Sequence, residues 1–317
     1  SPQIRDRMTH LYPGVHVTDD LDAVLSDDSV SSVMVAVPAA THYAVATRAL
    51  AAGKHTYVEK PITLDVDEAT DLVRLADQQD VRLMVGHLLL YHPCITWLKE
   101  TIDAGDLGDV LYLNSLRVNL GKVRSDENAM WSLAPHDISV AIYLLGELPI
   151  QVSAHGFTYL QRRAGIEDVV FMTLRFADGR AAQIHISWLD PHKKRQLTVV
   201  GSRKMVTFDD MQATEKVRVY DKGVDGTEDL DVAPSYESYG DLLTLRSGDV
   251  LIPHIPMREP LRSLCEHFLA AVDRGETPRT DGRNGLDVLR VLHAAQQSLE
   301  AGGAPVSVPA GTQGEPG

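Results

Sequence analysis

The sequence predicts an α/β plus α+β protein: a doubly wound parallel sheet, followed by a domain built on an open antiparallel sheet. Short apolar strands alternate with helices over roughly the first ninety residues, which indicates the parallel sheet. Later runs of alternating apolar and polar residues, joined by a hairpin turn, indicate the antiparallel one. The 317 residues suit two domains of about 100–200 residues each. We expect domains at 1–90 and 91–301, and a disordered Gly- and Pro-rich tail over 302–317.

The elements of the first domain follow from local patterns. Asp65 and Glu68 form a capping box, and the apolar residues behind them recur with a helical period. A doubly wound domain usually opens with a strand, a GxGxxG loop and a helix. That loop does not occur in the sequence, so we expect the first βαβ portion to precede Ser1. The predicted elements are strands at Val33–Val37, His55–Val58 and Leu83–Val85, and helices at Thr41–Ala52 and Asp65–Gln79.

The second domain shows a period of two. Apolar residues alternate over Val169–Phe176, Asp178-Gly179 is a hairpin turn, and the alternation resumes from Ala182 to Trp188. Such hairpins predict an antiparallel sheet with one face buried. Further strands are expected at Leu197–Val200, Met205–Phe208 and Val217–Tyr220, and closing helices at Arg258–Asp273 and Gly285–Leu299.

Composition excludes several classes of function. A net charge of −14 argues against nucleic-acid binding, which needs basic patches, but leaves room for a small anionic ligand. No apolar run reaches the roughly 18 residues of a membrane span, and no signal peptide is visible. Cys94 and Cys265 lie far apart, and the histidines show no metal signature. We therefore expect a cytoplasmic protein without a metal site, a nucleic-acid partner or a membrane partner.

Lys60 is the first candidate for chemistry, in the run Tyr57-Val58-Glu59-Lys60-Pro61. The run ends a predicted strand, and open parallel sheets bind ligands at the carboxyl edge of their strands. Glu59 can pair with the lysine charge, and Pro61 fixes the backbone beyond it. A lysine there is either a surface cation or a group that stabilises a substrate alkoxide or donates a proton.

His136 is the second candidate, in the run Pro135-His136-Asp137. Proline suits the first turn of a helix, and the residues after it continue apolar to Gly146. We therefore expect His136 at a helix N-terminus, where an imidazole tends to stay neutral and can act as a base. A histidine that only satisfies local hydrogen bonds is the alternative. Asp137 would either orient His136 or cap the helix.

Two loops carry weaker signals. Residues 38–42 join a strand to a helix at the predicted edge of Lys60, where backbone amides can approach a ligand. Arg117, Asn119 and Arg124 lie around Gly121, and arginine recognises phosphate and carboxylate groups. A plain connection and a solvated loop are the respective alternatives.

Six motifs, in this order, resemble the Gfo/Idh/MocA oxidoreductases. They are Val-Pro-x-x-Thr-His at 37–42, Ala-Gly-Lys-His at 52–55, Glu-Lys-Pro at 59–61, Val-Gly-His at 85–87, Pro-His-Asp at 135–137 and the closing Pro278…Gly282…Gly285…Leu289. The resemblance covers nearly the whole chain. It implies a Rossmann-like NAD(P)-binding domain with an open-sheet domain, reversible oxidation of a sugar or polyol hydroxyl, and homo-oligomers, dimers or tetramers, formed through the second sheet.

The resemblance also implies roles for residues. Lys60 would be the catalytic lysine and His136 the acid/base. The cofactor, NAD or NADP, would be bound by Pro38, Thr41, His42, Glu59, Lys60, Pro61 and His87. Ser132 stands where many members carry an aspartate, four residues before the histidine, so the proton relay or the substrate grip must differ.

The substrate is expected to be a sugar, and a nucleotide-linked amino sugar such as a UDP-sugar in particular. The run from Arg117 to Trp131 looks like that of members acting on such substrates: an arginine pair could hold a diphosphate, and a Trp could pack on a sugar or base. The expected substrate-binding residues are Lys60, Arg117, Asn119, Arg124, Trp131, His136 and Asp137. A free sugar or inositol, a non-catalytic sugar-binding relative and an inactive fragment remain as alternatives.

Overall fold

The chain folds into two compact units. The computed structural model describes residues 2–121, 123–225, 244–309 and 311. Unit 1 comprises Ser1–Gly86 and Phe268–Gly282, and unit 2 comprises His87–His267 and Arg283–Gly317. The first boundary lies near the expected one at residue 90, but unit 1 also contains a later segment that the expected division assigned to the second domain. This segment pairs with β3 (Leu83–Val85): Asp281 forms a β-bridge with Met84, and the Val85 amide donates to the Thr280 carbonyl at 2.7 Å. Within the described part of the chain, no helix has the length and apolar character that a membrane crossing requires.

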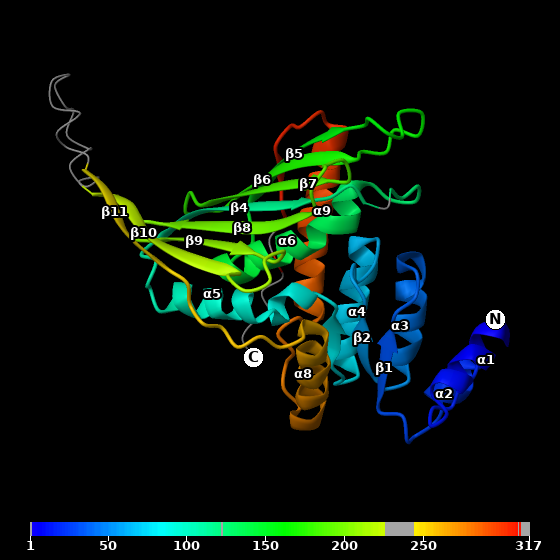
Figure 1. Ribbon diagram of the computed structural model, residues 1–317. Coiled ribbons are helices and arrows are strands. Elements are labelled where there is room, and N and C mark those ends of the chain that lie inside the picture. The colour runs from blue at the N-terminus through cyan, green and yellow to red at the C-terminus, as the bar shows by residue number, and fades with distance from the viewer. Residues whose placement is uncertain (1, 122, 226–243, 310, 312–317) are drawn as a thin grey trace. The chain divides into compact units, whose positions relative to one another are not determined.

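Unit 1 is built on a parallel sheet, as the sequence predicted (Figure 1). Its strands lie in the order β1 (Ser32–Val35), β2 (His55–Val58) and β3 (Leu83–Val85), and both pairings are parallel. Helix α3 packs against β1, β2 and α4. The helices of this unit are α1 (Pro2–Leu11), α2 (Leu21–Leu25), the short 3-10 helix η1 (Ala39–Thr41), α3 (His42–Ala51), α4 (Val66–Gln78) and residues 268–274 of α8 (Pro260–Arg274).

Helix α4 begins where the capping residue predicts. The Asp65 carboxylate accepts hydrogen bonds from the amides of Asp67 and Glu68 at 2.8 and 3.1 Å, which satisfies two of the donors that a helix start leaves without partners. Behind the cap, Ala69 and Leu72 are fully buried. The helical period of the sequence therefore marks the face that covers the core of unit 1.

Unit 2 is built on a nine-stranded sheet in the order β11-β10-β9-β8-β4-β7-β6-β5-β12. The hairpin of β6 and β7 is antiparallel, and Gly179 in its turn has a φ of +91°, a value that glycine adopts readily. Strands β4 and β7 pair in parallel, so the sheet is mixed rather than purely antiparallel. The strand bounds are β4 Val110–Val118, β5 Gln151–Phe157, β6 Val169–Arg175, β7 Ala181–Ser187, β8 Lys194–Gly201, β9 Met205–Asp209, β10 Val217–Asp225, β11 Thr244–Leu251 and β12 Val306–Ser307.

The expected disordered tail is wrong for its first residues. Val306 and Ser307 form β12 and pair with β5, and Val308 is buried. The sheet edge supplies backbone partners for this segment, which composition alone does not reveal. Of the remainder of the expected tail, residues 310 and 312–317 lie outside the described residues.

Helices pack against one another and against the sheet of unit 2. Helix α6 (Ala129–Leu145) contacts β4, β6 and β7, and α5 (Pro93–Asp103) contacts α6. The 3-10 helix η2 (Leu88–Tyr91) leads into α5, and α9 (Gly282–Glu300) runs toward the C-terminal segment. The Asn128 side chain begins α6 by accepting the Trp131 amide at 3.1 Å, and Gly146 ends it in the left-handed conformation.

Candidate functional site

The carboxyl ends of β1 and β2 are tied together by His42. Its ring is 1% exposed, with Nδ1 2.8 Å from the Pro61 carbonyl oxygen and Nε2 2.9 Å from that of Val37. Pro61 follows β2 and Val37 follows β1, so one side chain sets the spacing of both loops. His42, which the resemblance assigned to the cofactor, is thus placed to shape the edge on which Lys60 stands.

Glu59 and Lys60 follow β2 at this edge, half-buried, and the Lys60–Pro61 peptide bond is cis. The Glu59 carboxylate accepts a hydrogen bond from the Tyr57 hydroxyl at 2.9 Å. Gly86 lies against both: a Cβ atom there would be 2.5 Å from Tyr57 Oη and 2.9 Å from Glu59 Oε2. Any larger residue would displace the Tyr57–Glu59 pair, which explains the glycine at the end of β3.

Exposed groups at the edge of unit 1 suit a dinucleotide cofactor. Pro38, which precedes η1, and Thr41, its last residue, are both exposed. The Thr41 hydroxyl donates to the Pro38 carbonyl at 2.8 Å and keeps this turn compact. Together with the Lys60 ammonium, these groups lie at the carboxyl edge of parallel strands, where such cofactors bind. The pyrophosphate-binding GxGxxG motif is absent from this sequence.

His136 lies in the middle of α6, and the expectation of a helix start there is wrong. The helix begins at Ala129, so Pro135 is inside it and six helical residues precede that proline. The Asn128 cap and the burial of Ala129 and Met130 start the helix earlier than the proline suggests. Because the helix dipole acts mainly within the first turn, it gives no argument for a neutral His136.

His136 lines an open cleft of unit 2 with a volume of about 190 Å³. The cleft brings His136 together with Arg117 and Asn119, as the sequence expected of the substrate site. Buried Asn119 Oδ1 has no hydrogen-bond partner among the described residues. The other lining residues are Leu88, Leu89, Val118, Leu133, Lys193, Lys194 and Arg195. Four of the ten side chains are therefore lysine or arginine, in a chain whose net charge is −14.

Asp137 does not cap a helix but forms a buried ion pair with Arg117. Arg117 Nε donates to Asp137 Oδ2 at 2.5 Å and Nη2 to Oδ1 at 3.2 Å, and the Ser115 hydroxyl donates to Oδ1 at 2.6 Å. The paired fork of guanidinium and carboxylate is geometrically specific. It fixes the orientation of α6 against β4, and so the position of His136 on the cleft.

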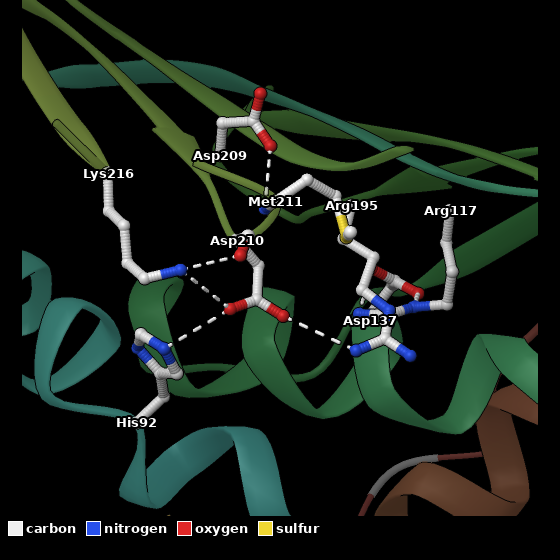
Figure 2. A network of polar contacts seen from close by, with 8 residues as sticks. All are labelled: His92, Arg117, Asp137, Arg195, Asp209, Asp210, Met211 and Lys216. Carbon is white, nitrogen blue, oxygen red and sulfur yellow. Dashed lines mark hydrogen bonds and ion pairs between the residues drawn. The ribbon is translucent and has the colours of Figure 1, made fainter. Parts of the chain in front are cut away.

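A second network of charges surrounds Asp210, in the turn after β9 (Figure 2). Its carboxylate lies 3.4 Å from His92 Nε2, from Lys216 Nζ and from Arg195 Nη1. His92 Nδ1 accepts the Cys94 amide, so the ring proton faces Asp210. The hydrogen bond from His92 lowers the pKa of the Asp210 carboxyl against the opposing effect of burial, and the neighbouring cations lower it further. Asp210 is therefore ionised at neutral pH.

Three expected site residues are occupied elsewhere. Arg124 pairs with Asp126 and Glu127, at 2.7 and 2.8 Å. Trp131 donates its indole N–H to Gln296 at 3.0 Å, and its ring meets His293 edge-on. His87 is buried, with Nδ1 2.8 Å from Asn284 Oδ1 of α9. None of the three lines the cleft of His136.

Sequence reasoning missed the basic residues that enter β8. Lys193, Lys194 and Arg195 line the cleft but were not singled out. The available signal was the run His192-Lys193-Lys194-Arg195, four potentially cationic residues in an acidic chain.

Comparisons with known proteins agree with this arrangement. Residues 5–87 match the profile of an oxidoreductase family with an NAD-binding Rossmann fold, named GFO/IDH/MocA. Residues 95–207 match the profile of the GFO/IDH/MocA C-terminal domain. The two matches follow the order of the two units.

Several of the relatives are dehydrogenases by name. A UDP-N-acetylglucosamine 3-dehydrogenase of Acidithiobacillus ferrooxidans is 31% identical, over 89% of this chain and 82% of the relative. An NADP(+)-dependent scyllo-inositol 2-dehydrogenase of Bacillus subtilis is 24% identical, over 90% of this chain and 82% of the relative. A solved structure of a UDP-N-acetylglucosamine 3-dehydrogenase from A. ferrooxidans superposes with a TM-score of 0.76 at 25% identity, covering 94% of this chain and 88% of that one.

Proposed function

The chain belongs to the Gfo/Idh/MocA family of NAD-binding oxidoreductases, and from this premise we propose that it oxidises one hydroxyl group of a nucleotide-linked sugar. The observation that carries the proposal is the cleft of His136, which gathers lysine and arginine in an acidic chain. A sugar hydroxyl needs a proton acceptor, and a nucleotide diphosphate needs cations. The relative that is 31% identical bears the name of an enzyme acting on such a substrate.

The proposed chemistry removes a hydride and a proton from one carbinol group, which leaves a ketone. Bound NAD or NADP supplies the hydride acceptor. We assign to His136 the transfer of the hydroxyl proton, which it later releases to solvent. For Lys60 we propose, from the family resemblance, the role of catalytic lysine, because an ammonium group can stabilise the negative charge that develops on an oxygen.

The cofactor roles are proposed residue by residue. Pro38 and Thr41 would line the nicotinamide side, because they are exposed at the edge of unit 1. Glu59 and Pro61 would shape that side, and His42 would support it through its two backbone contacts. A cofactor contact of His87 stays a prediction.

Steady-state kinetics test this function. The absorbance of reduced nicotinamide is followed with NAD or NADP and a panel of UDP-N-acetylglucosamine, UDP-glucose, glucose and inositols. We expect turnover of a UDP-sugar, and a loss of kcat of about 100-fold or more in Lys60→Ala and in His136→Asn. His16→Asn, at an exposed residue of unit 1, is the matched control. Unchanged turnover in Lys60→Ala would show that the lysine has no catalytic role.

An inositol or free-sugar dehydrogenase is the second candidate, favoured by the relatives that act on scyllo-inositol by name. Turnover of inositol without turnover of any UDP-sugar would establish it. Sugar binding by calorimetry without turnover of any panel member would instead point to a non-catalytic relative.

We also infer a homo-oligomer, a dimer or tetramer, formed through the sheet of unit 2. Phe157 and Phe171 are 43% and 38% exposed, and their rings lie 6.1 Å apart on neighbouring strands. Exposed aromatic groups of this kind favour an interface. Light scattering coupled to size exclusion measures the mass; a monomer would count against the inference. A cytoplasmic location stays a prediction, with which two cysteines that form no disulfide, Cys94 and Cys265, are compatible.

A further inference from the structure

We propose that Lys193 and Arg195 bind a phosphate group of the substrate in the cleft of His136. The inference rests on the proposed function, and it replaces the arginine pair that the sequence suggested for this task. Its basis is the position of the two residues in the lining of the cleft and the charge that their surroundings leave uncompensated.

The register of the sheet places Arg195 on the His136 side. Arg195 of β8 lies directly opposite Arg117 of β4 in an antiparallel pair, so the two side chains share one face. Arg117 reaches Asp137 of α6 on that face. Lys193 directly precedes β8 and, like Arg195, lines the cleft.

The other arginines near the cleft are already compensated. Arg117 shares a buried fork with Asp137, and Arg124 is paired with the exposed Asp126 and the half-buried Glu127. These carboxylates occupy the donors that a phosphate would need. The guanidinium groups of Arg117 and Arg124, which the sequence suggested for a diphosphate, therefore have few donors left for an anion.

Lys193 and Arg195 retain that capacity. Lys193 is exposed and makes no ion pair with any residue that the structure describes. Arg195 has one contact with a carboxylate, from Nη1 to Asp210 at 3.4 Å, and Asp210 also faces Lys216 and His92. One carboxylate is thus shared by two permanent cations, and a net positive charge remains beside the cleft.

Asp210 also positions Arg195, through the ion pair between its carboxylate and the guanidinium (Figure 2). Its amide donates to the Arg195 carbonyl at 2.9 Å, so backbone and side chain both locate the arginine. An arginine held in this way keeps the other edge of its fork for a ligand, and a nearby lysine adds a point charge. Phosphate oxygens are acceptors that match such a pair.

Calorimetric titration with UDP, without cofactor or turnover, tests the proposal. We expect Lys193→Gln and Arg195→Gln each to raise the Kd for UDP about 10- to 100-fold, the range for losing a hydrogen bond to a charged group. Uridine, which has no phosphate, should bind weakly to every variant. Lys204→Gln is the control: it removes the same charge beyond the other end of β8 and should leave the Kd unchanged. Thermal melting verifies that each variant is folded.

The source of the phosphate is separated by a second titration with glucose 6-phosphate. Tight binding of UDP but not of glucose 6-phosphate would show that the cleft recognises a nucleotide-linked sugar. Equal binding of both would show that it recognises any phosphate group. Equal affinities for UDP in the wild type and in both variants would overturn the proposal, as would wild-type affinity for uridine equal to that for UDP.

The two proposals fail separately. Loss of UDP binding in the variants, with no turnover of any sugar, would refute the dehydrogenase function and keep the phosphate site. Turnover of a UDP-sugar with a KM that neither substitution changes would refute the phosphate site alone.

Discussion

Asp137→Asn removes one charge from a buried ion pair and leaves Arg117 in place. The side chains of Asp137 and Arg117 are 6% and 10% exposed. The carboxylate accepts two hydrogen bonds from the guanidinium and one from Ser115. An asparagine of the same shape presents an NH2 group to some of these donors, so Arg117 loses both its counter-charge and part of its hydrogen bonding.

The expected loss is large because the charge that remains is buried. Removing one partner of a buried pair typically costs about 3–5 kcal/mol. This corresponds to a roughly 150- to 5,000-fold change in the unfolding equilibrium. For a unit of this size it lowers Tm by about 6–20 °C. An exposed pair would cost about 1 kcal/mol or less.

Urea unfolding followed by tryptophan fluorescence measures this loss in unit 2. All three tryptophans, Trp97, Trp131 and Trp188, lie in that unit, so the signal reports on it alone. Arg124→Gln, which breaks an exposed arginine pair, is the matched control. A loss below about 1 kcal/mol in Asp137→Asn, equal to that of the control, would refute the argument from burial.

Three further predictions concern packing, pH and thiol chemistry. Gly86→Ala should destabilise unit 1 by about 1–3 kcal/mol, measured by thermal melting, because its Cβ would meet Tyr57 Oη at 2.5 Å; an unchanged Tm would contradict this. Asp210→Asn should be less stable than the wild type at neutral pH. Hydrogen bonding lowers the pKa of Asp210 in the folded state. The difference in unfolding free energy between the wild type and Asp210→Asn should therefore hold above the unfolded pKa of about 3.9 and shrink as pH falls below it. A difference that stays constant from pH 7 into strong acid would argue against this reasoning. Burial raises the pKa of Cys94 to about 11, so a thiol reagent at pH 8 should label Cys265 first, and mass spectrometry of the peptides would reveal the opposite order.

Local patterns predicted the elements whose causes are local. The Asp65 cap, the period of α4 and the Asp178-Gly179 turn act within a few residues, and each is present in the structure. The start of α6 was missed because two local signals compete: Pro135 suggests a first turn, but Asn128 caps the helix seven residues earlier. Burial of the residues between them favours the earlier start.

The candidate site was harder to predict because its residues depend on partners distant in sequence. Arg117 lies in β4, a strand with several polar residues, and it is buried in an ion pair with Asp137 of α6. His92 meets Asp210 across more than a hundred residues of the chain. The residues that neighbour Arg117 and Arg195 in the sequence do not show whether either guanidinium will be paired with a carboxylate.

The sequence by itself determined the family, the parallel sheet with Lys60 at its carboxyl edge, and the alternating strands of the second sheet, because caps, turns and periods act between near neighbours. Only the tertiary structure decided which cations are compensated. It pairs Arg117 with Asp137 and leaves Lys193 without an acid among the described residues. The physical reason is that Coulomb and hydrogen-bond energies depend on distances in space, and the strand register and helix packing set those distances.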